Sequence, residues 1–306
     1  MYISSETRLF IREHSTDDVR TLALQSKKYP DVDMPVAITQ IAGRQIAAEK
    51  IPSWKKIEDI RYPKHLSLEQ CSSEITAYYK AGLLQGDSLT DLTGGFGVDC
   101  SFLAEKFKSV TYVERQEELC GIAAHNFPIL GLNHINVKNE DGIAHLKAMS
   151  PVDCIFLDPA RRNEHGGKAV AISDCEPDVA ALEGLLLNKA KQVMVKLSPM
   201  LDLSLALREL QQTQEVHIIS VNNECKELLL ILGQTIPQEI KIHCVNLSTK
   251  GEQEGQHFTF TREQEQCSQC NYTDSLDEYL YEPNASLLKA GAFKSLSSAF
   301  PIRKLH

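Results

Sequence analysis

Short apolar runs alternate with longer, mixed stretches along the middle of the chain. Runs of this length that are rich in β-branched residues are typical of buried strands. They are Val110–Val113, Ile135–Val137, Val152–Leu157, Gln192–Leu197, Val216–Val221 and Leu228–Leu232. Helix-forming residues fill the intervals, for example Gln116–Leu132, which Pro128 interrupts. Strands that alternate with helices predict a doubly wound α/β fold with a parallel sheet, whose ligand binds at the carboxyl ends of the strands.

The chain before these runs has a helical pattern instead. The apolar positions that share one helical face are Met34, Ile38, Ile41, Ala42 and Ala48. Gln45 interrupts this face, and Pro35 suits the first turn of a helix. We therefore expect a small helical domain over residues 1–65.

A further helix should lead from this domain into the sheet. Ser67 has the side chain of an N-cap, and Gln70 stands three residues later as its capping-box partner. The spacing predicts a helix over Leu68–Leu84, followed by a first strand that starts at Ser88. Because this helix start directly precedes the strand, Gln70, Ser72 and Ser73 are candidates for a supporting role at the ligand site.

The last part of the chain departs from the strand and helix alternation. Lys241–Val245 and His257–Phe260 alternate like a hairpin, which is either separate from the main sheet or an extension of it. From Asp277 the sequence changes character again, and residues 282–293 begin a new segment.

A glycine-rich turn follows the first strand, with the sequence Asp91-Leu-Thr-Gly-Gly-Phe-Gly-Val-Asp99. Glycines let a ligand approach the backbone, and free N–H groups in such a turn can bind an electronegative group. The dinucleotide fingerprint is incomplete, because Cys100 stands where its third glycine belongs. Asp91 disfavours a pyrophosphate and favours a cation. An adenosyl ligand with an amino-acid tail and a sulfonium fits best, and an ordinary strand-to-helix turn is the alternative.

Carboxylates recur where the following strands end. Glu114 lies 23 residues after Asp91, a spacing at which an acidic residue accepts hydrogen bonds from ribose hydroxyls. Asp141 follows the third strand, where it could accept a bond from the adenine amino group, and Asp158 follows the fourth. Any one of them could be a helix cap or a solvated side chain, but four in order favour a binding site.

Together these segments resemble the class I S-adenosylmethionine-dependent methyltransferases over residues 66–248. The resemblance implies a Rossmann-like, seven-stranded sheet in the order 3-2-1-4-5-7-6. It also implies that Asp91 and the glycines hold the methionine moiety, Glu114 the ribose and Asp141 the adenine. The residues expected to bind S-adenosylmethionine are Gln70, Ser72, Ser73, Asp91, Thr93, Gly95, Phe96, Gly97, Glu114, Arg115, Asp141 and Gly142.

Within this class the chain is similar to a bacterial group with a THUMP-like domain. Its core is also similar to trimethylguanosine synthase-type RNA guanine-N2 methyltransferases. The segments that carry this match are Leu66–Glu74, Asp91–Asp99, Asp158–Arg162 and Lys196–Asp202. The resemblance implies that residues 249–306 hold the hairpin and the start of a short α+β accessory domain, ferredoxin-like or THUMP-like, that continues beyond His306.

The segment after the fourth strand supplies the candidate acceptor chemistry. Asp158 and the carbonyl of Pro159 form an oxygen pair that could accept the N–H bonds of an amino group and direct its lone pair at a methyl group. Base-amino methyltransferases usually have a second proline and an aromatic at the next two places, where this chain has Ala160 and Arg161. Ala160, Arg161, Arg162, Ser198 and Pro199 are expected to line the acceptor pocket. Arg161 and Arg162 could clamp a phosphate, or pair with Glu164 or Asp174. Lys196 is more simply a lysine at the edge of the core.

Charge and cysteine content limit the remaining possibilities. The formal net charge of −9 argues against sequence-independent wrapping of nucleic acid. Residues 41–65 nevertheless carry six bases and three acids, and residues 285–306 carry four bases and no acid. Nine cysteines, an odd number, indicate reduced thiols in the cytoplasm. Cys267 and Cys270 have zinc-knuckle spacing without a second ligand pair, so we expect no metal. No apolar stretch is long enough for a membrane span.

The sequence therefore predicts an S-adenosylmethionine-dependent methyltransferase, with an exocyclic base nitrogen in RNA as the favoured acceptor. A methyltransferase that acts on a protein or a small metabolite is the first alternative. A non-catalytic module that binds an adenosyl ligand is the second. The oligomeric state is left open.

Overall fold

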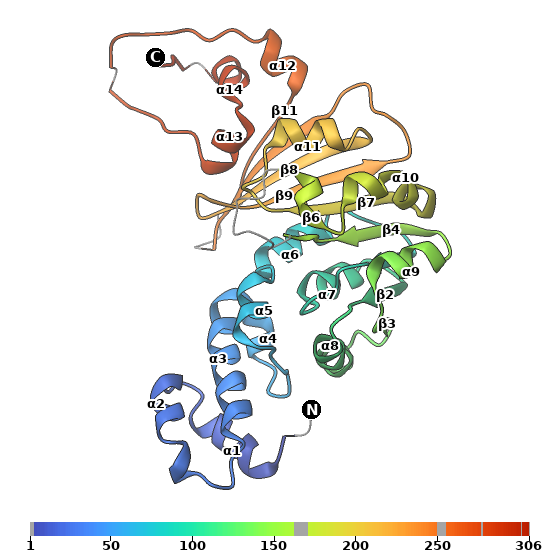
Figure 1. The fold of residues 1–306 in the computed structure, drawn as a ribbon. Helices are drawn as coiled ribbons and strands as arrows, with labels where there is room; N and C mark the ends of the chain where they lie inside the picture. The colour runs from blue at the N-terminus through green and yellow to red at the C-terminus, as the bar shows by residue number, and fades with distance from the viewer. Residues whose placement is uncertain (1–2, 162–170, 250–254, 277, 301, 306) are drawn as a thin grey trace. The chain divides into compact units, whose positions relative to one another are not determined.

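The computed structural model describes residues 3–161, 171–249, 255–276, 278–300 and 302–305. The chain divides into two compact units, Met1–His145 and Leu146–His306. Figure 1 shows the order of the elements along the chain, and each unit is described here by itself.

The first unit begins with a cluster of helices. These are α1 (Ser5–Glu13), α2 (Val19–Leu24), the 3₁₀ helix η1 (Ser26–Lys28), α3 (Met34–Lys50) and α4 (Pro52–Lys55). Side-chain oxygens of Ser4, Asp18 and Asp33 cap α1, α2 and α3. Pro35 lies in the first turn of α3, as its sequence position predicted. The helices pack around Phe10, Leu22, Met34, Ala37 and Ile41.

The predicted helix over Leu68–Leu84 is wrong, because two helices occupy this stretch. They are α5 (His65–Gln70) and α6 (Glu74–Ala81), and the chain is extended at Cys71 between them. Ser67 lies inside α5 and is not its cap, since the N-cap position belongs to Lys64. The break has a physical reason: Ser72 turns inward and its hydroxyl donates to the Asp99 carboxylate at 2.7 Å.

Three parallel strands complete the first unit, in the spatial order β1-β2-β3. They are β1 (Ser88–Asp91), β2 (Ser109–Val113) and β3 (Ile135–Lys138), with Leu89 opposite Val110 and Val110 opposite Ile135. The helices that follow these strands are α7 (Val98–Ala104), α8 (Glu117–Ile129) and α9 (Gly142–Ala148). This is the strand and helix alternation that the apolar runs predicted.

The second unit contains a mixed sheet in the order β4-β7-β9-β8-β10-β11. Its strands are β4 (Val152–Leu157), β7 (Ala190–Leu197), β8 (Thr213–Val221), β9 (Glu224–Gly233), β10 (Lys241–Leu247) and β11 (Gln256–Thr261). Strand β9 runs antiparallel to both of its neighbours, while β10 is parallel to β8. Asn222 and Asn223 have φ of 49° and 65°, the left-handed conformation that a tight hairpin between β8 and β9 requires.

Nine strands belong to the main sheet in the described residues, so the expected number of seven is wrong. The predicted order 3-2-1 describes the first unit, and 4-5-7-6 describes β4, β7, β9 and β8 in the second. The two extra strands are β10 and β11. Of the two alternatives for this hairpin, an extension of the sheet is therefore the correct one, because β10 pairs with β8 along its full length.

Shorter elements complete the second unit. They are β5 (Ala160–Arg161), η2 (Ile172–Asp174), β6 (Cys175–Glu176), α10 (Val179–Lys189), α11 (Leu203–Glu209), α12 (Arg262–Cys267), α13 (Ala285–Ala290) and α14 (Phe293–Ala299). Strands β5 and β6 form a separate antiparallel pair. In the part of the chain that is described, no helix has the length and apolar character that crossing a membrane requires. Bounds of 1–65, 66–248 and 249–306 for three domains stay a prediction.

Two helical glycines predict opposite effects of the same substitution. A Cβ on Gly43 would lie 2.3 Å from the Cβ of Tyr62, whereas one on Gly121 meets no described atom within 4 Å. We expect Gly43→Ala to lower the free energy of unfolding by about 1–3 kcal/mol through overpacking. Gly121→Ala should raise it by about 0.5–1 kcal/mol, because alanine loses less backbone entropy in a helix. Urea unfolding measures both, and a stabilised Gly43→Ala protein would contradict the packing of α3 on Tyr62.

Candidate functional site

The turn after β1 is built on buried carboxylates. The Asp91 side chain is almost fully buried, and its Oδ1 accepts a hydrogen bond from Thr93 N at 3.0 Å. Glu114, which follows β2, is 8% exposed. Its Oε2 accepts from Gly95 N at 2.9 Å and its Oε1 accepts from Gln116 N at 2.7 Å. The carboxylate of Glu114 therefore joins the glycine turn to the end of β2.

Four amides of this turn have acceptors within the protein. Thr93 N and Gly95 N donate to the two carboxylates, Gly94 N donates to the carbonyl of Val113, and Gly97 N donates to the carbonyl of Gly94. A phosphate site needs amides that point at the ligand. The turn therefore carries two carboxylates and four of its amides are already bonded, which opposes a pyrophosphate and suits a cationic group.

Aromatic side chains explain why glycines occupy the turn. A Cβ on Gly94 would lie 2.2 Å from the Tyr112 ring, and one on Gly97 would lie 2.9 Å from the Phe127 ring. Gly97 also has φ of 85°, a conformation that favours glycine. The Tyr112 hydroxyl donates to the carbonyl of Gly95, and burial raises the pKa of Tyr112 well above its usual value, so it stays a donor. These contacts hold the turn in one conformation.

Several predicted cofactor residues have structural partners in this unit. The Phe96 ring packs against Trp54 at a centroid distance of 5.1 Å, within a buried cluster. The Oδ1 of Asp141 accepts from Ala144 N at 2.9 Å, which is the bond of a helix cap at the start of α9. A Cβ on Gly142 would lie 2.3 Å from the carbonyl oxygen of Leu92, so glycine allows α9 to approach the turn. Their contacts with a cofactor stay predictions.

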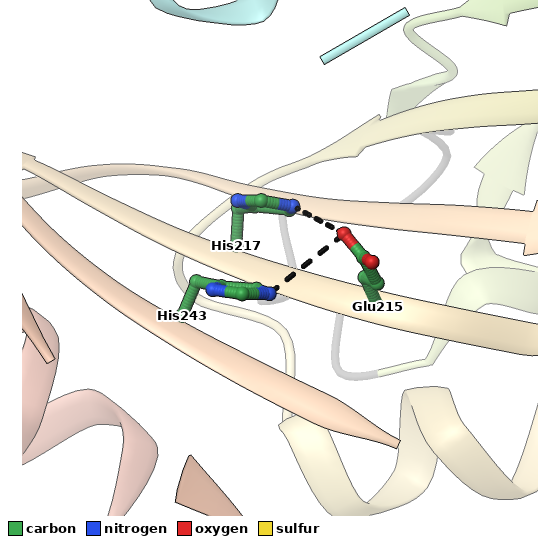
Figure 2. Close-up of side chains that lie close together, drawn as sticks. All are labelled: Glu215, His217 and His243. Carbon is green, nitrogen blue, oxygen red and sulfur yellow. Dashed lines mark ion pairs between the residues drawn. The ribbon is translucent and has the colours of Figure 1, made fainter. Parts of the chain in front are cut away.

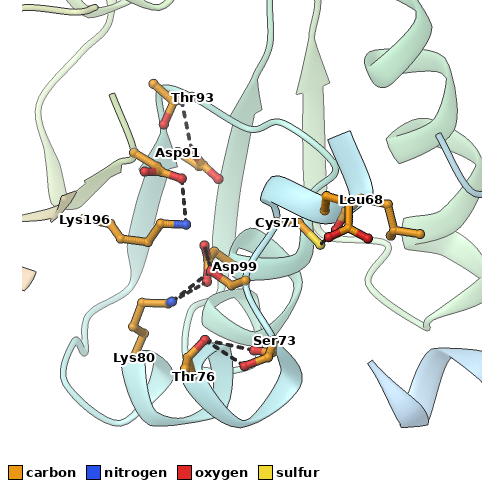
Figure 3. A network of polar contacts seen from close by, with 12 residues as sticks. Leu68, Cys71, Ser73, Thr76, Lys80, Asp91, Thr93, Asp99 and Lys196 are labelled. Atoms are coloured by element: carbon orange, nitrogen blue, oxygen red, sulfur yellow. Dashed lines mark hydrogen bonds and ion pairs between the residues drawn. The ribbon is translucent and has the colours of Figure 1, made fainter. Parts of the chain in front are cut away.

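A buried ionic network supports the turn from the side of α6, and the sequence did not reveal it. Lys80 is fully buried, and its Nζ lies 3.0 Å from Oδ1 of Asp99 and 3.0 Å from the hydroxyl of Ser72. Figure 3 shows Lys80 on α6 pointing at Asp99 on α7. Ser73, at the start of α6, contacts Thr76 at 3.3 Å between hydroxyl oxygens. Of the predicted supporting residues, Ser72 thus contacts α7, while Gln70 is exposed at the end of α5.

The predicted acceptor residues lie in the second unit. Asp158 follows β4, and its Oδ2 lies 2.6 Å from Nζ of Lys196, a buried lysine near the end of β7. Ser198 follows β7 and its hydroxyl oxygen accepts from Met200 N at 3.3 Å. Lys196 is therefore an ion-pair partner of the candidate catalytic carboxylate, a role that its place in the sequence did not show.

The other described residues predicted for the site lie at the ends of strands or beside them. Arg115 is exposed after Glu114, and Pro159 is buried after Asp158. Ala160 and Arg161 form the short strand β5, where Ala160 pairs with Glu176 and Arg161 with Cys175. Pro199 begins the turn after β7. Arg162 and Glu164 lie outside the described residues.

The fold is that of class I S-adenosylmethionine-dependent methyltransferases. Residues 37–163 match the family model of protein-L-isoaspartate(D-aspartate) O-methyltransferases, and residues 279–306 match that of a ferredoxin-like domain. The crystal structure of a proposed methyltransferase from Porphyromonas gingivalis W83 is 34% identical, with a TM-score of 0.85, and the match covers 100% of this chain and 77% of that one. The chain belongs to the same methyltransferase family as that protein.

More distant structures share only parts of the chain. An rRNA methylase from Streptococcus thermophilus is 14% identical with a TM-score of 0.37, over 52% of this chain and 93% of that one. A proposed methyltransferase from Streptococcus mutans, solved in complex with SAH, is 12% identical with a TM-score of 0.37, over 52% and 96%. At these values the similarity supports no argument about substrate or ligand. No curated protein matches the chain.

The buried pair of Lys80 and Asp99 predicts a large and non-additive effect on stability. Lys80→Met removes the Nζ that lies 3.0 Å from Oδ1 of the buried Asp99, which should cost about 3–5 kcal/mol of unfolding free energy. Lys80→Met combined with Asp99→Leu should cost clearly less than Lys80→Met alone, because no charge is then left behind.

Urea unfolding of the single and double variants measures this coupling. Lys108→Met is the control, since Lys108 pairs with Asp87 at 2.9 Å on the surface and its loss should cost no more than about 1 kcal/mol. Equal losses of unfolding free energy in Lys80→Met and Lys108→Met would show that the buried pair contributes no more to stability than a surface ion pair.

Proposed function

We propose that this chain transfers a methyl group from S-adenosylmethionine to an exocyclic nitrogen of an RNA base. The identity of the methyl donor is supported by the hydrogen bonds and the charge of the glycine turn. Its amides donate to Asp91, Glu114, Val113 and Gly94, and the two carboxylates are almost fully buried. A ligand with a sulfonium and an amino group complements this turn, whereas a dinucleotide would bring phosphates to it.

The proposed donor site places the methionine moiety at Asp91 and the glycines, the ribose at Glu114 and the adenine at Asp141. A carboxylate has about four lone-pair positions, so Glu114 can hold Gly95 and Gln116 and still accept from a ribose hydroxyl. The carboxylate of Asp141 accepts one bond from Ala144 N, so it likewise has lone pairs left to accept from the adenine amino group. When bound, the cofactor supplies an electrophilic methyl group, and the protein residues orient it and exclude water.

The proposed acceptor site centres on Asp158. Its contact with Lys196, whose side chain is buried, orients the partly exposed carboxylate and compensates its charge. A carboxylate held in this way can accept an N–H bond from an amino group, and the Pro159 carbonyl can accept the other. The lone pair of the nitrogen then points at the methyl group. Positioning of this kind contributes up to about 7–11 kcal/mol to catalysis in favourable cases.

The case for RNA rests on the distribution of charge. In the basic region 41–65, Lys55 and Lys56 are exposed on the helical part of the first unit. Other bases there have partners: Lys64 pairs with Glu118 at 3.1 Å, and Lys50 donates to backbone carbonyls of α5. The exposed lysines can contact phosphates locally, while the net charge of −9 opposes extended binding.

Ligand binding tests the donor half alone. We expect S-adenosylmethionine and S-adenosylhomocysteine to bind in calorimetry, and NAD to give no heat of binding. Glu114→Gln should weaken both adenosyl ligands, because it replaces one acceptor oxygen at the turn by a donor. Binding of NAD, with no heat of binding for either adenosyl ligand, would exclude a methyltransferase.

Transfer of a labelled methyl group into separated RNA, protein and metabolite fractions tests the acceptor. We expect label in RNA, lost in Asp158→Ala while the affinity for the cofactor stays within a few-fold. Asp153→Ala is the matched control, because Asp153 lies on the same strand but pairs with the exposed Lys191 at 2.7 Å. Arg161→Ala should weaken RNA binding and reduce its salt dependence. Full transfer by Asp158→Ala would refute this site, and label in protein carboxyl groups would refute the RNA acceptor.

A further inference from the structure

Two histidines and a glutamate gather on one face of the sheet in the second unit. Glu215 and His217 are two residues apart on β8, so their side chains project from the same face. His243 on β10 is the register partner of His217, because β8 and β10 pair in parallel. The topology therefore places three potential ligands side by side, and Figure 2 shows them converging.

The atoms that face each other are all metal-ligating atoms. Oε2 of Glu215 lies 3.5 Å from Nε2 of His217 and 3.7 Å from Nε2 of His243. One ligand atom from each residue lies within 4.8 Å of the other two. The two imidazole rings are stacked, with centroids 4.5 Å apart and an angle of 13° between their planes. The stacking aligns both Nε2 atoms toward the same carboxylate oxygen.

A neighbouring strand holds one of these rings in place. Nδ1 of His243 lies 2.9 Å from the hydroxyl of Thr259, its register partner on β11. When Nδ1 carries the proton and donates to this hydroxyl, Nε2 has the lone pair that a metal requires. A hydrogen bond on the far nitrogen is the usual support of a metal-bound histidine.

Burial also affects the protonation of the two imidazole rings. Burial and, to a lesser extent, the adjacent His243 lower the pKa of His217 to about 3. Burial also lowers the pKa of His243, although Glu215 acts in the opposite direction. These pKa shifts favour the neutral imidazole, which is the form of histidine that binds a metal.

We propose that Glu215, His217 and His243 bind a divalent transition-metal ion, with Zn²⁺ as the best fit. Two imidazoles and one carboxylate are a recognised ligand set for zinc. Zn–N and Zn–O distances of about 2.0–2.2 Å imply separations of about 3.4 Å between ligand atoms around a tetrahedral ion. The observed 3.5 and 3.7 Å from Glu215 to the two histidines are close to this separation, and all three ligand atoms lie within 4.8 Å of one another.

The exposure of the three residues and their position along the strands indicate what a bound ion would do. His217 is 3% exposed, whereas the side chain of Glu215 is 43% exposed, so solvent reaches the ion from the glutamate side. The site lies on β8 and β10 four residues before the carboxyl ends of both strands, Val221 and Leu247. This is about 13 Å along a strand. The ion would therefore join β8 to β10 and stabilise the extension of the sheet, without a part in methyl transfer.

This proposal departs from the expectation of no metal. That expectation considered Cys267 and Cys270, whose spacing is a familiar zinc signal, and the pair remains expected not to bind. The cluster on β8 and β10 has no motif in the sequence, because Glu215 and His217 are separated by one residue and His243 follows 26 residues later. Only the pairing of the two strands brings the ligands together.

Zinc titration of the chelator-treated protein tests the proposal. We expect about one Zn²⁺ per chain by calorimetry and metal analysis, and a rise in melting temperature with added zinc. His243→Gln and Glu215→Gln should each lower the affinity by at least about tenfold and abolish the rise. These two positions are chosen because both side chains are partly exposed, so the variants should fold.

Two control variants test whether zinc binds at other histidine or cysteine residues. His257→Gln changes an exposed histidine on β11, and the double variant Cys267→Ser/Cys270→Ser removes the cysteine pair; both should bind zinc as the parent protein does. Co²⁺ should give a visible absorption band in the parent protein that Glu215→Gln alters. Unchanged zinc binding in His243→Gln, loss of zinc in the cysteine variant, or no binding by the parent would each overturn the proposal.

Discussion

The first unit depends on the carboxylate of Glu114, which accepts from Gly95 on one oxygen and from Gln116 on the other. A buried carboxylate must be hydrogen-bonded, and here its donors come from the turn after β1 and from the start of α8. The bond consumes the amide that a phosphate would otherwise use. The same interaction thus fixes the backbone and leaves the turn with a buried negative charge. Gly94 and Gly97 follow from it, since a turn held this close to Tyr112 and Phe127 has no room for a Cβ.

The buried network of Lys80, Asp99 and Ser72 imposes a second constraint on the same region. A lysine with no exposed surface requires a counter-ion, and Asp99 supplies it from the first turn of α7. Ser72 lies in the break between α5 and α6, where its side chain is not confined to the face that a continuous helix would give it. From there it contacts both Lys80 and Asp99. The satisfaction of one buried charge therefore determines where α5 ends and α6 begins.

Local patterns predicted the strands well, because each buried strand is a short apolar run such as Val152–Leu157, bounded by polar residues. They failed where a distant partner decides the outcome. Ser67 has the local signature of a cap, yet the helix starts at His65 and stops at Gln70, just before Ser72, which Asp99 holds. Lys196 is unremarkable in the sequence, and its meaning depends on Asp158, 38 residues earlier. Candidate carboxylates at strand ends were visible, whereas the lysines that compensate such charges were not.

The extension of the sheet shows how topology creates chemistry that no local pattern contains. Strand β9 reverses direction through Asn222 and Asn223, whose left-handed backbone makes a tight hairpin possible. The side of β8 away from β9 is then an edge with unpaired backbone groups, and β10 covers it. Parallel pairing in this register sets His243 beside His217, and β11 adds Thr259 beside His243. The edge strands that made the sheet larger than expected are thus also the strands that assemble the proposed metal ligands.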